Sequence, residues 1–307
     1  MENKKPYSIK TINEFHQLRD LPKPKHPLIS VIDFSDIKSG SNGGSESVIQ
    51  NFYSISLKRS TNSKMIYGQQ EYDFDSGVLF FLSPNQVFNV NHSEKKAGPH
   101  HTGWLLLVHP DFIWNTTLAK TIRQYQFFDY AVNEALFLSD DEERTLNSII
   151  GNIRKEYNSN IDAFSQSIII SQIETLLNYS ERFYQRQFIT RKKLNHQILE
   201  RLEKLLTDYF NGEDLISKGL PTVQYVAEKL NVSPGYLGSL LRALIGQNTQ
   251  QYIHNKLIEK AKEKLSTTNL SVSEVAYELG FEHLQSFSKL FKAKTNVSPL
   301  AFRQSFN

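Results

Sequence analysis

A repeat in the last third of the 307-residue sequence constrains the fold more than any other feature. When residues 222–252 are laid over residues 271–302, ten apolar or small positions coincide. At an offset of 49, Val223, Val226, Ala227, Leu230 and Val232 match Val272, Val275, Ala276, Leu279 and Phe281. One additional residue in the second copy makes the offset 50, and Leu237, Leu240, Leu241, Gly246 and Tyr252 then match Phe287, Leu290, Phe291, Asn296 and Phe302. The two segments therefore predict the same local structure twice.

Each copy predicts a short helix, a tight turn and a second helix. The pattern Val-x-x-Val-Ala-x-x-Leu places four apolar side chains on one face of two helical turns, and its alanine leaves room for a closely crossing helix. The residues expected at the helix ends are Thr222 and Ser271 as N-caps, Glu274 completing a capping box, Ser233 with Pro234 at the next helix start, and Gly246 and Asn296 as left-handed C-terminal residues. The sequence thus predicts two helix-turn-helix units, at residues 222–246 and 271–296.

Residues 248–267 predict one continuous helix between the two units. About 20 residues at about 1.5 Å each span roughly 30 Å. Successive major grooves on one face of a DNA duplex lie about 34 Å apart. One helix-turn-helix alone would be a common structural motif, but two copies joined by a helix of this length predict that both enter neighbouring grooves of one duplex.

The charge distribution favours a nucleic-acid partner for the C-terminal part. Residues 1–190 hold 19 Lys and Arg against 21 Asp and Glu, a balance of −2, whereas residues 191–307 hold 16 against 11, a balance of +5. A basic segment beside a slightly acidic one is typical of proteins that bind nucleic acid, although ordinary solvated helices also carry such an excess.

Several classes of protein are disfavoured by what the sequence lacks. It contains no cysteine, which excludes disulfides, a cysteine nucleophile and zinc fingers. No signal-peptide core follows the N-terminus, and no apolar run approaches the ~18 residues of a membrane span, so we expect a cytoplasmic protein without a membrane partner. We find no phosphate-binding loop, nucleophile elbow or catalytic carboxylate pair, so we expect no enzyme, no cofactor and no metal.

Residues 1–135 are predicted to form a β-rich domain. Short apolar runs bounded by turn residues indicate strands at LISVIDF (28–34), VIQNFYSISLKR (48–59), GVLFFL, QVFNV and GWLLLV. Such runs at close spacing are typical of an antiparallel sandwich or barrel.

Residues 136–190 are assigned to a helical dimerisation or linker region, followed by a DNA-binding domain of residues 191–307. Ser139 is placed to cap a helix that starts with four acidic residues at 140–143. An apolar stripe then runs from Phe164 to Phe183 with helical spacing. The stripe either packs on the β-rich domain or forms a dimer contact, because both demand the same pattern.

The C-terminal motifs resemble those of the AraC/XylS family. SVSEVAYELGF and QSFSKLFKAKTNVSPLAFR are similar to that family's second helix-turn-helix, and VSPGYLGSLLRALIG and QYIHNKLIEKAKEKL to its first recognition helix and linker helix. The resemblance covers residues 194–305, with weaker similarity upstream in HPDFIW and YQFFDYAVNEALFLSDDE. It implies an α+β, two-domain chain: an N-terminal cupin-like β-barrel with C-terminal helices, then an all-α double helix-turn-helix domain that binds promoter DNA.

On the second predicted recognition helix, four polar residues remain after the core positions are removed: Gln285, Ser286, Lys289 and Lys292. Glutamine can pair with adenine, and lysine can donate to guanine or to phosphate. The family resemblance makes Gln285 and Lys289 the preferred base-reading residues. For each of the four, the alternative is an ordinary solvated residue.

On the first predicted recognition helix, the candidates for DNA contact are Tyr236, Ser239 and Arg242. Family members often carry a long polar or basic residue where this chain has Gly238 and Ser239, so we expect this unit to depend on Tyr236, Arg242 and backbone contacts. Gln247, Asn248, Thr249 and Arg303 lie near helix ends, where phosphate contacts are typical.

Two alternative functions stay open. The histidines His92, His100, His101 and His109 could hold a metal in a cupin enzyme, but the His-x-His pair with a following Glu that such enzymes use is missing, and His109 before Pro110 fits a strand-to-helix turn. The second alternative is a regulator without a ligand, whose β-rich domain only contacts proteins.

The function we expect is that of an AraC-type regulator. It forms a homodimer, responds to a small-molecule effector in its N-terminal domain and contacts RNA polymerase.

Overall fold

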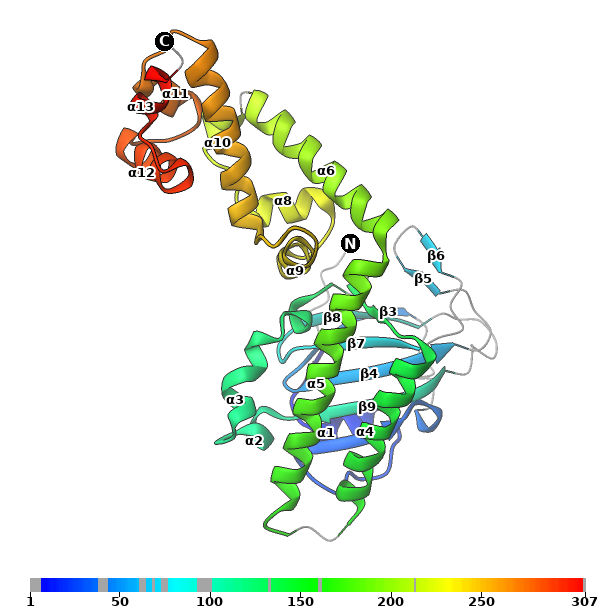
Figure 1. Cartoon of the computed structure of the whole chain (residues 1–307). Helices are drawn as coiled ribbons and strands as arrows, with labels where there is room; N and C mark the ends of the chain where they lie inside the picture. The colour runs from blue at the N-terminus through cyan, green and yellow to red at the C-terminus, as the bar shows by residue number, and fades with distance from the viewer. Residues whose placement is uncertain are drawn as a thin grey trace. The chain divides into compact units, whose positions relative to one another are not determined.

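The computed structural model divides the chain into two compact units, Met1–Gln187 and Phe188–Asn307 (Figure 1). It describes residues 7–37, 44–60, 65–67, 70–72, 77–92, 101–131, 134–159, 162–212 and 214–305. Each unit is described below by itself.

The first unit is built around a five-stranded antiparallel sheet with the order β10-β7-β4-β9-β2. Its strands are β2 (Ile29–Asp33), β4 (Tyr53–Ser60), β7 (Val78–Leu82), β9 (His101–Val108) and β10 (Leu136–Phe137). In the register, Ile55 of β4 lies opposite Phe81 of β7 and Leu106 of β9. All three side chains are buried, as expected for apolar residues at the centre of a sheet.

A smaller sheet has the order β1-β3-β8, in which β1 (Tyr7–Ile9) runs parallel to β3 (Gly44–Gln50) and β8 (Val87–His92) runs antiparallel to it. A third sheet pairs β5 (Met65–Tyr67) with β6 (Gln70–Tyr72). One core cluster combines residues of both larger sheets and of helix α1 (Ile12–Leu18): Ile9, Ile12, Phe15, Ile32, Val48, Phe52, Leu105 and Leu107. Over the described residues these sheets do not close into a barrel.

The predicted strands are confirmed, except that one predicted strand is two strands in the structure. The run 48–59 forms parts of β3 and β4, which belong to different sheets. Asn51 and Phe52 interrupt the strand. The Asn51 N–H donates to the Ile9 carbonyl at 3.0 Å, and the Phe52 side chain is fully buried. Continuous β-propensity concealed this change of sheet.

Helices follow the strands, as expected. They are α2 (Pro110–Ile113), α3 (Thr117–Thr121), α4 (Asp140–Asn158) and α5 (Ser165–Thr190), with short 3-10 turns at Phe34–Asp36, Ile122–Gln124 and Gln126–Asp129. In Figure 1, α4 and α5 lie across the five-stranded sheet, and the indole Nε1 of Trp104 in β9 donates to Asn147 Oδ1 of α4 at 2.8 Å. Most of the apolar stripe on α5 is buried, whereas Phe164 and Ile168 at its start are exposed.

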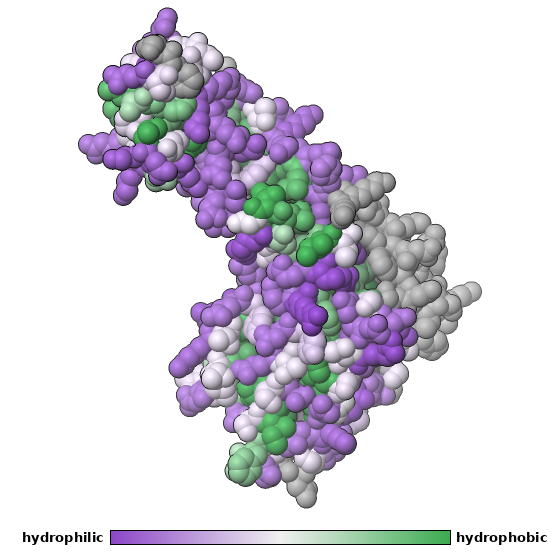
Figure 2. Space-filling view, in the orientation of Figure 1, coloured by the Kyte–Doolittle hydropathy of each residue, from purple (hydrophilic) through white to green (hydrophobic). Residues whose placement is uncertain are grey.

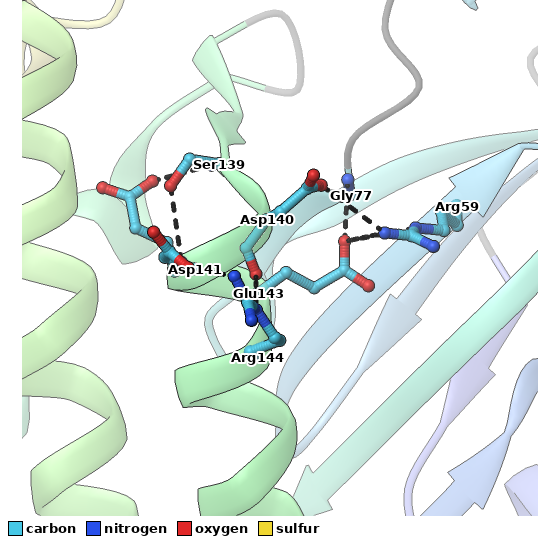
Figure 3. Close-up of polar contacts among 8 residues, drawn as sticks. Arg59, Gly77, Ser139, Asp140, Asp141, Glu143 and Arg144 are labelled. Carbon is cyan, nitrogen blue, oxygen red and sulfur yellow. Dashed lines mark hydrogen bonds and ion pairs between the residues drawn. The ribbon is translucent and has the colours of Figure 1, made fainter.

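The acidic start of α4 is a helix cap and an ion-pair site (Figure 3). Ser139 and Glu142 form the capping box, which confirms Ser139 as the N-cap. Glu143 is buried, and its Oε2 accepts from the Gly77 N–H at 3.1 Å and lies 3.1 Å from Arg59 Nη2. These contacts fix the first turn of α4 against β4 and the start of β7.

The second unit is entirely helical over its described residues, as predicted. Its helices are α6 (Lys192–Asn211), α7 (Asp214–Lys218), α8 (Val223–Leu230), α9 (Pro234–Ile245), α10 (Thr249–Thr267), α11 (Val272–Glu278), α12 (Leu284–Thr295) and α13 (Pro299–Gln304), preceded by the last residues of α5. Among the described helices, none has the combination of length and apolar character needed to cross a bilayer.

Of the four histidines at 92, 100, 101 and 109, the structure describes the side chain of His109. His109 is the N-cap of α2, and its Nδ1 accepts from the Asp111 N–H at 3.2 Å, which confirms its predicted place in a strand-to-helix turn. His100 and the side chains of His92 and His101 lie outside the described residues. Within the residues that the structure does describe, no three His, Asp or Glu side chains gather as a metal ion would require.

Candidate nucleic-acid interface

The first predicted helix-turn-helix unit consists of α8 and α9. The Thr222 hydroxyl accepts from the Tyr225 N–H at 3.1 Å, and the Ser233 hydroxyl accepts from the Tyr236 N–H at 3.1 Å. Pro234 occupies the first turn of α9, and Gly246 ends this helix with φ 70°. The capping residues predicted for this unit are therefore confirmed.

The second unit, α11 and α12, repeats this construction. Ser271 and Glu274 form the predicted capping box, and Asn296 ends α12 with φ 64°. The hydrogen bonds of the Ser271 backbone and hydroxyl lower the pKa of the Glu274 carboxyl. Both units therefore begin and end as the repeat predicted.

The turns inside the two units share a feature that the sequence reasoning missed. Asn231 has φ 57° and Gly280 has φ 76°, so both lie in the left-handed region. Their numbers differ by 49, which makes them equivalent positions of the repeat. Asparagine and glycine are the residues that tolerate this conformation best, so their coincidence was an available signal. A side chain at Gly280 is also excluded sterically, because its Cβ would lie 2.6 Å from the Leu215 carbonyl oxygen.

The repeated apolar positions form the cores of the two units. Ala227 and Ala276 are fully buried, as expected where two helices cross closely. In the second unit the core is aromatic: Phe287 lies between Phe281 and Phe291, with ring centroids 5.4 and 5.7 Å away. Phe302 of α13 extends the series, 5.5 Å from Phe291.

Helix α10 joins the two units as one continuous helix, as predicted. Asn248 and Gln251 form a capping box at its start. Near its end, Lys264 Nζ lies 2.6 Å from Glu278 Oε2 of α11, and Arg303 Nε of α13 donates to the Leu265 carbonyl at 3.2 Å. Its 19 residues, at about 1.5 Å each, span roughly 28 Å. The visible face of α10 is largely hydrophilic in Figure 2, while the opposite stripe, from Tyr252 to Leu265, is buried against the unit's other helices.

The predicted DNA-contacting residues of α12 are all on the surface. Gln285, Ser286, Lys289 and Lys292 are exposed, while Phe287 and Phe291 fill the core and Leu290 is half-buried. Residues 284–307 contain Lys289, Lys292, Lys294 and Arg303 but no Asp or Glu. Helix α12, the second predicted recognition helix, therefore presents a polar face in a locally basic segment.

The candidates on α9 are placed differently. Arg242 is exposed, and its Nη2 donates to Ser239 Oγ at 3.4 Å. Tyr236 is 4% exposed and Ser239 is 6% exposed, and Gly238 is buried as well. The expectation that Tyr236 and Ser239 lie on an open face is therefore wrong for this structure.

The cause of part of this burial is the end of α5. The Phe188 ring is 1% exposed and packs against the Tyr236 ring, with centroids 5.1 Å apart. Asn195 of α6 donates a hydrogen bond from its side-chain nitrogen to the Phe188 carbonyl, which fixes the junction between α5 and α6. The residue spacing within 222–246 carries no information about a contact with residue 188.

One histidine lies between the two units. His254 of α10 hydrogen-bonds with Gln250 at 2.7 Å, and burial together with the nearby Lys294 ammonium lowers the pKa of its imidazole. His254 therefore adds no positive charge to α10 at neutral pH.

A family model described as a helix-turn-helix domain matches residues 226–305. The matched segment contains most of α8, then α9 to α12, and α13, and so includes both units and the helix between them. Residues 226–305 are an AraC-type helix-turn-helix domain.

Two curated relatives have matching segments. The chain is 33% identical over 143 residues to the uncharacterized HTH-type transcriptional regulator YfiF of Bacillus subtilis, covering 46% of this chain and 42% of that protein. It is 34% identical over 80 residues to the HTH-type transcriptional activator AarP of Providencia stuartii, covering 26% of this chain and 59% of that protein. The chain thus matches less than two thirds of the length of each relative.

Among solved structures, the AraC-type domain is similar to the C-terminal domain of AraT, a response regulator from Geobacillus stearothermophilus. The identity is 31%, the match covers 35% of this chain and 84% of that one, and the TM-score is 0.31.

Proposed function

We propose that the chain is a sequence-specific, DNA-binding transcription regulator of the AraC type. The observation that carries this proposal is the pair of matching helix-turn-helix units at the two ends of α10, with an exposed polar and basic face on α12. The span of α10, roughly 28 Å, is close to the about 34 Å between successive major grooves on one face of DNA. The similarity to regulators named as HTH-type supports the same function.

In the proposed complex, α12 lies in a major groove. Gln285 and Lys289 contact base edges, and Ser286 and Lys292 contact bases or the adjacent phosphates, since lysine donates to guanine or phosphate and glutamine pairs with adenine. All four side chains are exposed, so α12 itself presents them without a prior rearrangement.

The first helix-turn-helix unit, α8 and α9, makes a different contribution. Arg242 is exposed and available to a phosphate or a guanine. Tyr236 and Ser239 remain proposed contacts, but both are buried, and Tyr236 reaches DNA only if the Phe188 ring moves away from it. We therefore expect α12 to carry most of the sequence specificity.

For the rest of the chain we propose the finer assignments that the family suggests. Residues 1–135 form a cupin-like sensor, residues 136–190 a dimerisation and linker region, and residues 191–307 the DNA-binding domain. The protein is a cytoplasmic homodimer without catalytic activity, responds to a small-molecule effector and contacts RNA polymerase. A regulator whose β-rich unit only binds proteins is the second candidate, because Phe81 of β7 and Trp104 of β9 are buried as core.

The proposal is tested by selecting bound duplexes from a randomised DNA pool with the full chain. The expected result is a defined consensus, and the double variant Gln285→Ala, Lys289→Ala should lose the preference at a contiguous part of it. Recovery of unrelated sequences with equal affinity would contradict sequence-specific binding.

A further inference from the structure

A cavity of about 400 Å³ lies in the first unit, where the turn between α4 and α5 meets the start of β2. Its volume is within the range of about 300–1,000 Å³ typical of small-molecule sites. Its apolar wall includes Ile29, Phe112 and Ile169, each no more than 4% exposed. The proposed DNA-binding function uses none of these residues.

The cavity is held open by contacts between separate elements. Gln166 Nε2 of α5 donates to the Phe112 carbonyl of α2 at 2.6 Å. The Tyr157 hydroxyl of α4 accepts from the Lys25 N–H at 2.8 Å. The ring of His26 packs edge-on against Phe112, with centroids 5.3 Å apart. Because α2, α4, α5 and the segment before β2 are tied together, the cavity is preformed.

The same contacts fix which polar atoms can serve a ligand. His26 Nδ1 accepts from the Leu28 N–H at 3.1 Å, so the neutral ring carries its proton on Nε2. The Gln166 amide nitrogen is used by Phe112, which leaves its Oε1 as an acceptor. The wall thus offers the Gln166 Oε1 acceptor, the His26 Nε2–H donor and an aromatic surface.

The charge in the lining has one sign. Glu156 and Asp162 are carboxylates, and the described residues of the lining include no lysine or arginine. The Asp162 Oδ1 atom caps α5, accepting from the N–H groups of Phe164 and Ser165 at 2.8 and 3.0 Å. Burial lowers the pKa of His26, so its imidazole is neutral at physiological pH. Both carboxylates would therefore repel an anion, whereas a cation would meet Glu156, Oε1 of Gln166 and the Phe112 ring.

We propose that this cavity binds a small organic cation, an ammonium group on an aromatic or short aliphatic body. The ammonium pairs with the Glu156 carboxylate, and the body packs against Phe112 and Ile169. Cations are attracted both by a carboxylate and by the face of an aromatic ring.

The position of the cavity also suggests its role, a step that rests on the proposed function. Ser165, Gln166 and Ile169 lie in the first turns of α5, and Phe188 near the other end of this 26-residue helix packs on recognition helix α9. A ligand bound at the start of α5 contacts the same helix whose last turn covers Tyr236. The cation is accordingly the effector of the proposed regulator.

The binding test compares three probes of equal shape by titration calorimetry on the full chain: 2-phenylethylamine, 2-phenylethanol and phenylacetate. We expect the amine to bind at least tenfold more tightly than phenylacetate. Glu156→Gln should weaken amine binding by about tenfold, the value of one charge-assisted hydrogen bond. The matched variant Glu200→Gln, which removes an exposed carboxylate of α6, should leave the affinity unchanged.

A second variant distinguishes loss of binding in the cavity from a general loss of folding. Ala163→Trp adds bulk at an exposed edge of the cavity, so it should abolish amine binding while the unfolding temperature stays close to that of the parent. Tighter binding of phenylacetate, no binding of the amine, or equal effects of the Glu156 and Glu200 substitutions would each overturn the site.

The effector role is tested with the selected operator duplex, with and without saturating 2-phenylethylamine. A change in operator affinity of threefold or more, absent in Glu156→Gln, is expected. Unchanged affinity would overturn the effector role alone. Failure to bind any operator in either condition would instead count against the proposed function.

Discussion

The Phe188 ring lies against the Tyr236 ring with centroids 5.1 Å apart and planes inclined at 69°. Phe188 is in the last turn of α5 and Tyr236 is in the first turn of α9, so the contact joins the end of the long helix to the first recognition helix. Edge-to-face aromatic pairs contribute about 0.5–1.5 kcal/mol beyond the area they bury. The contact stabilises the compact unit Phe188–Asn307. It also buries Tyr236, which is proposed to touch DNA.

Replacing Phe188 by alanine should lower the free energy of unfolding of the second unit. A buried phenylalanine truncated to alanine typically costs about 3–5 kcal/mol, because apolar contacts are lost and a cavity remains. Ile189→Ala is the matched control, since this neighbour is 56% exposed. Urea unfolding should separate the two variants clearly, and equal midpoints would show that the Phe188 contact contributes nothing.

Lys289→Ala should weaken operator binding by about 1–3 kcal/mol without changing the fold, because its side chain is exposed on α12. Lys120→Ala, an exposed lysine on α3 of the first unit, is the matched control and should bind normally. Gel-shift titration at fixed salt measures both.

Operator affinity should also fall steeply as salt rises, because neutralised phosphates release their counterions. Lys289→Ala should make this salt dependence shallower if its ammonium contacts a phosphate. Affinity that is independent of salt would argue against phosphate contacts by the basic segment altogether.

Two glycines in or beside α4 should respond oppositely to alanine. A Cβ at Gly77 would lie 2.7 Å from Glu143 Oε2, so Gly77→Ala displaces the carboxylate from its contacts with Arg59 and the backbone (Figure 3). We expect a loss of about 1–3 kcal/mol, the cost of leaving a buried polar group poorly paired. Gly151 has no atom within 4 Å of its would-be Cβ and lies inside α4, so Gly151→Ala should stabilise by about 0.5–1 kcal/mol. Thermal unfolding of both variants gives the comparison, and a shift of the same sign in both would refute it.

Acid should destabilise the folded chain through three histidines. Burial is the largest cause that lowers the pKa of His16, His26 and His254 below the ordinary value of 6.5. The unfolded chain therefore binds more protons than the folded chain in the window below 6.5, and stability is fully present above it and falls as pH drops through the folded values. The unfolding temperature should be lower at pH 5 than at pH 7.5. His16→Gln should reduce this difference, because His16 is 6% exposed and bonded to Pro22 and Ser30.

Local signals in the sequence predicted both helix-turn-helix units well. The caps at Thr222, Ser233 and Ser271 depend on hydrogen bonds between residues at most three positions apart, and the buried faces depend on helical spacing. The exposure of Lys289 follows from the same spacing once Phe287 and Phe291 are placed inside.

The rest depends on contacts distant in sequence. No local pattern around Tyr236 indicates that residue 188 covers it, and no pattern around Glu156 indicates a cavity shared with His26 and Phe112. The strands were predictable from apolar runs, but their division between separate sheets depends on pairings such as Ile9 with Gln50 that spacing cannot supply. The turn residues Asn231 and Gly280 could have been found from the repeat itself.

The central claim is tested most directly by a hydroxyl-radical footprint of the full chain on its selected duplex. Two protected segments on one face of the duplex, separated by about one helical turn, are predicted, and Gln285→Ala with Lys289→Ala should erase one of them while the other persists. A single continuous footprint that these substitutions leave unchanged would show that the two units at the ends of α10 do not enter neighbouring grooves.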